Sequence, residues 1–221
     1  MSLHERATSH AALGDPRRLS IVDQLALSDR TVVELSELVD MRTNLLAHHL
    51  DILESASLIE RNVSEGDHRR KYVSLCWDSL PSTPKVSTAP AATVAFICTH
   101  NSARSQFAAA LFQQITGRTA ISAGSQPAKA VHPLAIKAAA GMGVDLSRAV
   151  PGGYERIVAP PDLVVSVCDR VRESELPRGR HLIHWSVPDP VKGGTLQSFR
   201  NSFAAITTRL ERLTSIGEPC P

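Results

Sequence analysis

The spacing of apolar residues in the first 80 positions predicts several short helices. An Asp-Pro pair at Asp15 and Pro16 is typical of a helix start, because Asp caps a helix well and Pro is favoured at the first helical position. Apolar residues follow at helical spacing through Leu27: they are Leu19, Ile21, Val22, Leu25 and Ala26. A second helix is expected to be capped by Thr31 and a third to run from about Thr43 to Ser55; their inward positions are Val32, Leu35 and Leu38, then Leu46, Leu50 and Leu53.

Two apolar runs after these helices predict a β-hairpin. Residues 57–63 and 69–75 flank a polar tip at residues 64–68 that contains Gly66. Short helices followed by such a wing form the arrangement that lays a helix in the major groove of DNA.

The pattern changes at Thr93, where strands begin to alternate with helices. Continuous apolar runs predict strands buried on both faces: they are residues 93–97, 120–123, 163–167 and 181–185. Helices are expected at residues 105–116, 133–142 and 196–216. Such alternation favours a parallel sheet covered by helices, with ligands bound beyond the carboxyl ends of the strands.

Charge and composition place a boundary between these two patterns. Residues 1–85 contain 10 Lys and Arg against 13 Asp and Glu, whereas residues 86–221 contain 14 against 9. Between them, residues 81–92 contain three prolines and four hydroxyl residues with little to bury, as expected of a linker. We therefore expect domains at residues 1–80 and 93–217, a linker at 81–92 and a tail at 218–221.

Composition also narrows the class of protein. The chain of 221 residues is 43% hydrophobic, which is ordinary for a protein with a packed core. No apolar stretch approaches the roughly 20 residues needed to span a bilayer, and the start lacks the pattern of a secretory signal. Four cysteines in this length do not form a disulfide framework, so a reducing cytoplasm is expected.

The most informative chemistry lies just after the first strand of the second domain. Five residues, Thr99, His100, Asn101, Ser102 and Ala103, separate Cys98 from Arg104, where a helix is expected to begin. This geometry wraps backbone N–H groups around a point above a helix N-terminus, a site for a tetrahedral oxyanion. Arg104 adds a planar fork for two oxygens, and Ser105 can donate to the sulfur. The positive surroundings favour Cys98 as a thiolate nucleophile.

Residues 93–216 resemble the low-molecular-weight tyrosine phosphatase fold, and within it the thioredoxin-coupled arsenate reductases. The resemblance implies a four-stranded parallel sheet and, through Asp189-Pro190 in HWSVPDPVKGGTLQSF, a general acid at Asp189. It also implies arsenate as substrate, with phosphate or sulfate as analogues.

Three positions depart from this family. His100 stands where glycine is common, so a bulky side chain enters where the backbone needs freedom. Ala103 replaces a second loop cysteine. Cys168 matches the first cysteine of a relay pair, but Glu175 occupies the second position.

The first domain resembles the winged-helix repressors of the arsenic-resistance family. The match covers ALGDPRRLSIVDQL (12–25), LLAHHLDILESASLIER (45–61) and the wing. It implies a homodimer that binds double-stranded DNA, with residues 42–50 reading bases. The implied contacts are Arg42, Thr43, Asn44, His48 and His49 on the helix, and Arg69, Arg70 and Lys71 on phosphates. Either histidine is also consistent with an ordinary surface or half-buried imidazole.

Two features limit this second resemblance. The Cys-x-Cys of the family's arsenic sensors is missing from VVELSELVD (32–40), and the net charge of −3 over residues 1–85 argues against strong non-specific DNA binding. A winged helix kept only for dimerisation is the alternative to DNA binding.

Two reactions start alike at Cys98 and differ in how the adduct is resolved. A phosphatase admits water, whereas a reductase brings a second thiol. Tyrosine phosphatases of this fold usually place aromatic residues just after the Asp-Pro pair to hold the tyrosine ring, whereas residues 191–194 here are VKGG. Residues 122–147 and Trp185 resemble the reductase branch of the family. We therefore predict an arsenate reductase, with a tyrosine phosphatase or an oxyanion-sensing regulator without turnover as alternatives.

The cysteines set the expected electron path. The resolving thiol is expected from Cys168, Cys220, or an external small thiol or redoxin, whereas Cys76 is expected in the core. No His and Cys lie at metal-ligand spacing, so we predict neither a metal nor a bound cofactor.

Overall fold

A computed structural model describes residues 2–80 and 92–215 of the chain. The chain forms two compact units, one mainly from the first 80 residues and one mainly from residue 92 onward. The predicted linker lies outside the described residues except for Ala92, so the predicted boundaries at 80 and 93 stay predictions.

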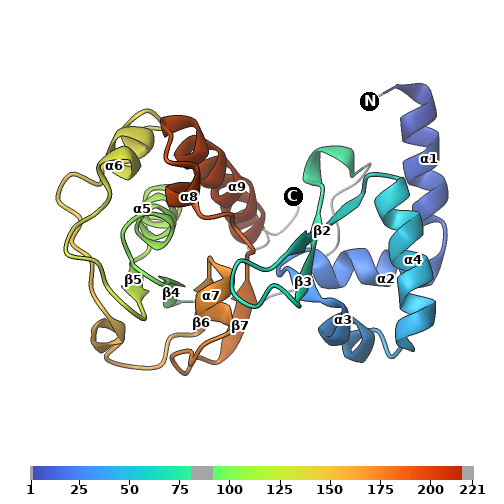
Figure 1. Cartoon of the computed structure of the whole chain (residues 1–221), viewed down its shortest axis with the longest axis horizontal. Helices are drawn as coiled ribbons and strands as arrows, with labels where there is room; N and C mark the ends of the chain where they lie inside the picture. Colours follow the sequence, from blue (N-terminus) through green and yellow to red (C-terminus); the bar gives the residue numbers. More distant parts are fainter. Residues whose placement is uncertain (1, 81–91, 216–221) are drawn as a thin grey trace. The chain divides into compact units, whose positions relative to one another are not determined.

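The N-terminal unit consists of four α-helices and a small antiparallel sheet in its described part (Figure 1). The helices are α1 Leu3–Leu13, α2 Pro16–Leu25, α3 Val32–Leu38 and α4 Thr43–Ser55. The strands are β1 Arg30–Thr31, β2 Ile59–Val63 and β3 Lys71–Leu75, in the order β1-β3-β2, followed by a 3₁₀ turn η1 Trp77–Ser79. The predicted winged helix-turn-helix is confirmed.

Side-chain caps explain where α1, α2 and α3 begin. Asp15 Oδ1 accepts from the N–H groups of Arg17 and Arg18, as the Asp-Pro signal predicts. Thr31 and Glu34 form a capping box at α3. Helix α1 was not predicted, although Ser2 and Glu5 form the same box at its start. The Ser-x-x-Glu spacing was the signal that would have located it.

The apolar faces of these helices meet in one core. Leu35, Leu46, Leu50 and Leu53 are completely buried there, together with Ile21. The expectation that Leu19 and Leu38 face the core is wrong. Leu19 is 46% exposed and Leu38 is 47% exposed. Each lies toward the outer flank of a short helix, where the apolar stripe is wider than the surface that packs against the core.

The C-terminal unit is built on a four-stranded sheet whose strands are all parallel. The strands β4 Val94–Cys98, β5 Ala120–Gly124, β6 Leu163–Ser166 and β7 His181–His184 lie in the order β5-β4-β6-β7. The helices are α5 Arg104–Thr116, α6 Pro133–Ala140, α7 Asp169–Arg172, α8 Pro190–Gly193 and α9 Leu196–Ser215, with a 3₁₀ turn η2 Tyr154–Arg156. The predicted parallel sheet of this fold is confirmed.

Aromatic side chains fill the core of this unit. Helix α5 packs on β5 and on α9, and α6 also packs on α9 (Figure 1). Phe107 of α5 and Phe203 of α9 are fully buried and stack with ring centroids 4.0 Å apart. Because β4 lies inside the sheet, its carboxyl end at Cys98 is held by neighbours on both sides.

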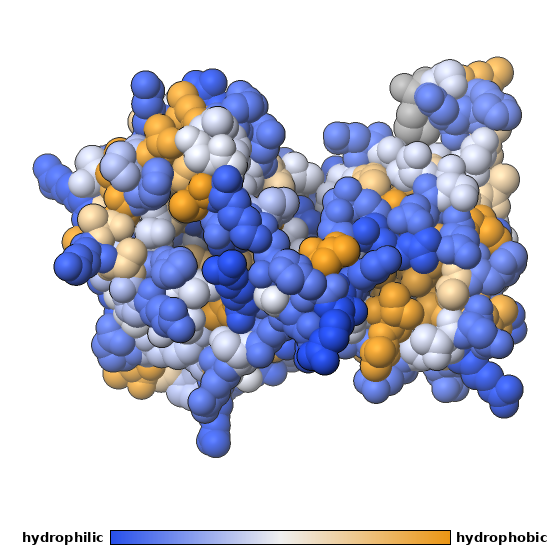
Figure 2. Space-filling model, in the orientation of Figure 1, coloured by the Kyte–Doolittle hydropathy of each residue, from blue (hydrophilic) through white to orange (hydrophobic). Residues whose placement is uncertain are grey.

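Outside the two cores, hydrophilic side chains dominate the visible face of each unit, and hydrophobic ones gather only in small groups (Figure 2). Among the described helices, none is both long and apolar enough to cross a membrane.

Candidate functional site

The loop between β4 and α5 surrounds the sulfur of Cys98 with hydrogen-bond donors. Cys98 is 3% exposed, and its Sγ lies 3.2 Å from the backbone nitrogen of Asn101 and 2.9 Å from Ser105 Oγ. The N-cap residue of α5, Ala103, offers no side-chain acceptor to the first turn of the helix. Unpaired N–H groups at such a helix start bind anions.

Four backbone carbonyls of the loop are bound by a segment outside it. The carbonyls of Cys98, Thr99, His100 and Ser102 accept from the N–H groups of residues 125, 126, 128 and 132. In a trans peptide the N–H points opposite to the C=O, so these bonds turn the loop's N–H groups toward the sulfur side. The Asn101 N–H, which shares a peptide plane with the His100 carbonyl, does point at Cys98 Sγ. Donors arranged in this way can hold an oxyanion, and we call the loop at residues 98–104 the cradle.

Asn101 carries the unusual backbone of this loop. Its φ is +48°, in the left-handed region that Asn adopts more readily than most residues. His100, which stands where the family commonly has glycine, does not have a positive φ, and its side chain is exposed. A bulky residue therefore fits at this position. The strained position is the next residue.

Arg104 lies at the edge of the cradle, and only 7% of it is exposed. Its Nη1 donates to the carbonyl of Val187 at 2.7 Å, and its Nη2 lies 3.5 Å from Asp189 Oδ1. Burial alone would lower the pKa of this guanidinium, but electrostatic interaction with the ionisable side chains of Cys168, Cys98 and Asp189 outweighs burial and raises it. Arg104 therefore stays a cation although it is buried.

Asp189 reaches the site from the segment that precedes α9. It is the N-cap of α8, where its Oδ1 accepts from the Val191 N–H at 3.2 Å. The same oxygen faces Arg104. The structure thus brings Asp189 next to Arg104, although Asp189 comes much later in the sequence than Cys98, Arg104 and Ser105.

Cys168 lies beside the same loop. It follows β6 and is the N-cap of α7, and its Sγ is 3.4 Å from Thr99 Oγ1. Burial raises the pKa of this thiol, and the charge of Arg104 opposes that shift. Cys220, the second predicted resolving thiol, lies outside the described residues.

The buried pair next to Cys168 steadies α7. Asp169 Oδ1 lies 3.2 Å from His184 Nε2, and His184 Nδ1 lies 2.9 Å from Ser166 Oγ. Burial would raise the pKa of Asp169, but hydrogen bonds, foremost that with His184, bring it below its ordinary value.

Cys76 was expected in the core of the N-terminal unit, but it is not among the buried residues of that core. It is half-buried after β3, and burial raises the pKa of its thiol to about 11. Such a thiol is a poor nucleophile at neutral pH. Within residues 2–80 and 92–215, no cluster of three His, Cys, Asp or Glu is placed to hold a metal ion.

The predicted DNA-contacting residues are mostly exposed on α4 and on the wing. Arg42, Thr43 and Asn44 are exposed at the start of α4, and His48 is exposed one turn later. Arg69, Arg70 and Lys71 are exposed at the start of β3.

His49 is the exception, and the prediction that it contacts DNA is wrong. Its side chain is 5% exposed and packs on the inner face of α4 with Leu46, Leu50 and Leu53. Neither ring nitrogen has a hydrogen-bond partner among the described residues. The helical period places residue 49 three positions after Leu46, which puts it on the buried stripe.

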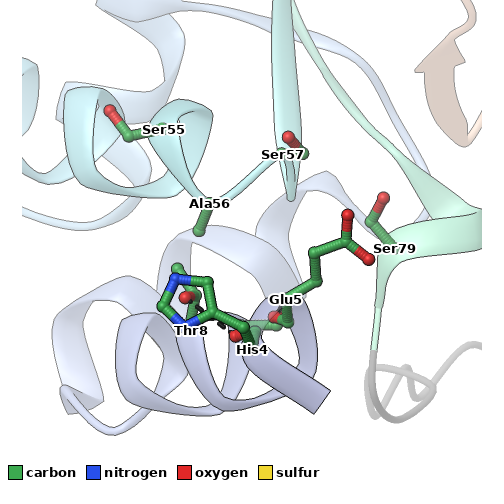
Figure 3. Close-up of a pocket in the computed structure, with 8 residues that line it drawn as sticks. His4, Glu5, Thr8, Ser55, Ala56, Ser57 and Ser79 are labelled. Atoms are coloured by element: carbon green, nitrogen blue, oxygen red, sulfur yellow. Dashed lines mark hydrogen bonds between the residues drawn. The ribbon is translucent and has the colours of Figure 1, made fainter. Parts of the chain in front are cut away.

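The N-terminal unit contains a hollow between the start of α1 and the end of α4 (Figure 3). It is lined by His4, Glu5, Thr8, Ser9, Ser55, Ala56, Ser57 and Ser79. The carboxylate of Glu5 is already used in the capping box with Ser2. None of the predicted site residues lines this hollow.

Comparison with known protein families agrees with both halves of the structure. The family model described as low molecular weight phosphotyrosine protein phosphatase matches residues 93–217. The model of the bacterial regulatory protein arsR family matches residues 15–61.

Individual relatives match the C-terminal part over nearly their whole length. An arsenate reductase of Bacillus cereus (strain 03BB102) is 35% identical over 132 residues, which are 57% of this chain and 96% of that protein. An arsenate reductase of Brevibacillus brevis is 30% identical over 131 residues, with the same two shares. A solved structure described as an arsenate reductase in the phosphate binding state is 26% identical, with a TM-score of 0.50, and covers 57% of this chain and 98% of that one.

Both resemblances predicted from the sequence are therefore confirmed. The family model spans more than half of the residues, and the curated relatives are matched almost end to end. The chain belongs to the low molecular weight phosphotyrosine protein phosphatase family, here fused to a segment of the bacterial arsR regulatory family.

Proposed function

We propose that the C-terminal unit reduces arsenate to arsenite through a covalent adduct on Cys98. The observation that carries the proposal is the set of donors around this sulfur: the Asn101 N–H at 3.2 Å and Ser105 Oγ at 2.9 Å, with Arg104 and Asp189 at the edge. The names of the curated relatives support arsenate as the substrate.

The first step forms the adduct. The thiolate of Cys98 attacks arsenic opposite the departing oxygen, so that an S–As bond forms and an As–O bond breaks. Arg104 and the loop N–H groups hold the other oxygens. The departing oxygen takes a proton from Asp189 and leaves as water.

The second step transfers two electrons. A second thiolate attacks the Cys98 sulfur, and an S–S bond forms as the S–As bond breaks. The bonding pair stays on arsenic, which is reduced from the +5 to the +3 state and leaves as arsenite. An external thiol or redoxin then reduces the disulfide.

The second thiol is either Cys168 or an external one. Cys168 is supported by its position against Thr99 of the loop. Its burial argues for an external thiol, because a buried neutral thiol attacks slowly until it moves or ionises. Replacing Cys168 with Ser separates the two routes: turnover with a small thiol persists only if the external thiol attacks directly.

The test is turnover by the purified full chain. Arsenite production is measured with arsenate and either a small thiol or a thioredoxin system, and wild type is expected to turn over with at least one donor. Cys98→Ser should abolish turnover. Cys76→Ser, which removes a thiol in the N-terminal unit, should leave it unchanged. A Cys98→Ser variant that is nearly as active as wild type would reject the site.

The family match favours one other activity on the same site, the hydrolysis of a phosphotyrosine ester. No aromatic residue is present in α8, which follows Asp189 and consists of Pro190, Val191, Lys192 and Gly193. Release of phosphate from an aryl phosphate, without arsenite formation from arsenate, would replace the reductase proposal with a phosphatase.

We also propose that the N-terminal unit binds double-stranded DNA as a homodimer. The arsR family match and the exposed side chains at the start of α4 and on β3 support this. Selection from a random duplex library, followed by fluorescence anisotropy over a range of salt, tests it. Changing Arg69, Arg70 and Lys71 to Ala should reduce the salt slope by about 0.9 for each phosphate that the protein no longer neutralises.

The control for this test is Lys129→Ala, which removes an exposed cation from the C-terminal unit and should leave the slope unchanged. A dimer should appear by analytical ultracentrifugation. If arsenate changes DNA affinity but the chain forms no arsenite, the C-terminal unit senses an oxyanion and does not turn it over.

A further inference from the structure

The side-chain amide of Asn101 has an orientation that its neighbours dictate. The backbone N–H of Gly152 lies 2.9 Å from Asn101 Oδ1, and Asn101 Nδ2 lies 2.8 Å from Ser105 Oγ. A backbone N–H can only donate, so the atom that faces Gly152 must be the amide oxygen. The NH₂ group is therefore held against Ser105.

This orientation decides the direction of the hydrogen bond to the nucleophile. Ser105 Oγ lies 2.9 Å from Cys98 Sγ, and distance alone does not say which atom donates. Because Ser105 Oγ accepts from Asn101 Nδ2, its single hydrogen is left for the sulfur. A hydroxyl that donates in this way stabilises the thiolate and not the thiol.

Gln106, the next residue on α5, holds this chain of bonds in place. Only 6% of it is exposed. Its Nε2 donates to Asn101 Oδ1 and to the carbonyl of Val150, each at 2.9 Å. Its Oε1 accepts from Ser122 Oγ at 3.1 Å. The Val150 carbonyl can only accept, so this amide is also fixed in one orientation.

We propose that Gln106 is a positioning residue for the nucleophile. It touches neither the sulfur nor the space for the anion. It supplies the second donor that keeps Asn101 Oδ1 turned away from Ser105, and it thereby keeps the Ser105 hydrogen on the sulfur. The proposal rests on the proposed function only in taking Cys98 as the nucleophile.

Gln106→Glu is the test, because it changes one atom and little volume. A carboxyl in place of the amide presents oxygen to two acceptors, Asn101 Oδ1 and the Val150 carbonyl. Ionised, it has no hydrogen to offer, and protonated, it has one hydrogen for two acceptors. Asn101 then loses a donor on its oxygen, and the bond from Ser105 to the sulfur loses its fixed direction.

The readout is the rate at which iodoacetamide alkylates Cys98 as a function of pH, followed by mass spectrometry of the Cys98 peptide. In Gln106→Glu the midpoint of this profile should rise by about one pH unit, which is about a tenfold lower rate at pH values below the midpoint. The kcat for arsenate should fall by a similar factor, while KM stays within about twofold because Arg104 is untouched.

Two further variants keep the test decisive. Gln113→Glu makes the same change at an exposed position of α5 and should leave the profile unchanged. Ser122→Ala removes only the donor to Gln106 Oε1 and should shift the midpoint in the same direction by a smaller amount. It also serves if Gln106→Glu does not fold, as judged by circular dichroism.

A folded Gln106→Glu or Ser122→Ala variant with the midpoint of wild type would overturn the proposal. An equal shift in Gln113→Glu would also overturn it, because a general charge effect would then explain the result. The alkylation profile does not need arsenate. If the wild-type chain does not turn over arsenate, the proposed function is refuted, and the pH midpoints of Cys98 alkylation still decide this inference.

Discussion

Gly124 lies at the end of β5, directly beside Cys98 in the sheet, and we predict that Gly124→Ala disrupts the anion cradle. A Cβ at this position would lie 2.7 Å from the Thr99 carbonyl oxygen and 2.9 Å from the Asn101 nitrogen. Ordinary contact begins near 3.4 Å, so strand and loop must separate by about half an ångström or more. Both neighbours are backbone atoms, which no side-chain rotation can move aside.

The size of the effect follows from what must move. Overpacking of a well-packed site costs about 1–3 kcal/mol in the free energy of unfolding. The Asn101 N–H that moves is the one that donates to Cys98 Sγ at 3.2 Å. A hydrogen bond to a charged group contributes about 1.5–3 kcal/mol. We therefore expect arsenate turnover to fall by about 10- to 100-fold, with weaker binding of phosphate as a substrate analogue.

Denaturant unfolding, phosphate titration and turnover check this prediction. Each unit contains one tryptophan, Trp77 in the N-terminal unit and Trp185 in the C-terminal unit. A Trp77→Phe background therefore lets fluorescence report the C-terminal unit alone.

The matched control is Gly141→Ala, since a Cβ there would come no closer than 3.4 Å to another atom and φ is an ordinary −66°. It should change stability by less than about 1 kcal/mol. If Gly124→Ala binds phosphate, turns over and unfolds as wild type does, the loop is more compliant than its contacts indicate and the reasoning fails.

Three further predictions address other parts of the chain. Phe107→Ala removes a fully buried ring stacked on Phe203 and should lower the unfolding free energy of the C-terminal unit by about 3–5 kcal/mol, read from Trp185 fluorescence; a loss below about 1 kcal/mol would contradict it. Asp189→Asn should lower kcat by about 10²–10⁴-fold while phosphate still binds, and an unchanged kcat would remove Asp189 from the mechanism. Burial lowers the pKa of His49, and the charges facing it are Asp15, Arg18, His48 and Arg17. As pH falls below about 6.5, the unfolded chain binds a proton that the folded unit resists, so stability of the N-terminal unit should decline until the folded pKa is passed. In a Trp185→Phe background, Trp77 fluorescence reports the unfolding of the N-terminal unit. The stability of this unit should decline less with falling pH in His49→Leu than in the chain that keeps His49, and equal declines would exclude His49 as the cause.

Local signals were enough to predict the order and type of most helices and strands from the sequence. The Asp15-Pro16 start, the apolar runs of the four strands and the glycine tip of the wing each act over a few residues. The position of Cys98 between a strand and a helix start was also local, and it predicted an anion loop. These signals matched two families, and the comparisons confirmed both.

Only the folded chain shows which atoms face the sulfur and in which direction their hydrogen bonds run. Gly152, Val187 and Ser122 contact the loop or its helix from distant segments, and no periodicity places them there. A hydrogen-bond network depends on where separate strands end relative to one another. That geometry is set by packing of the whole sheet, so it becomes visible only once the chain is folded.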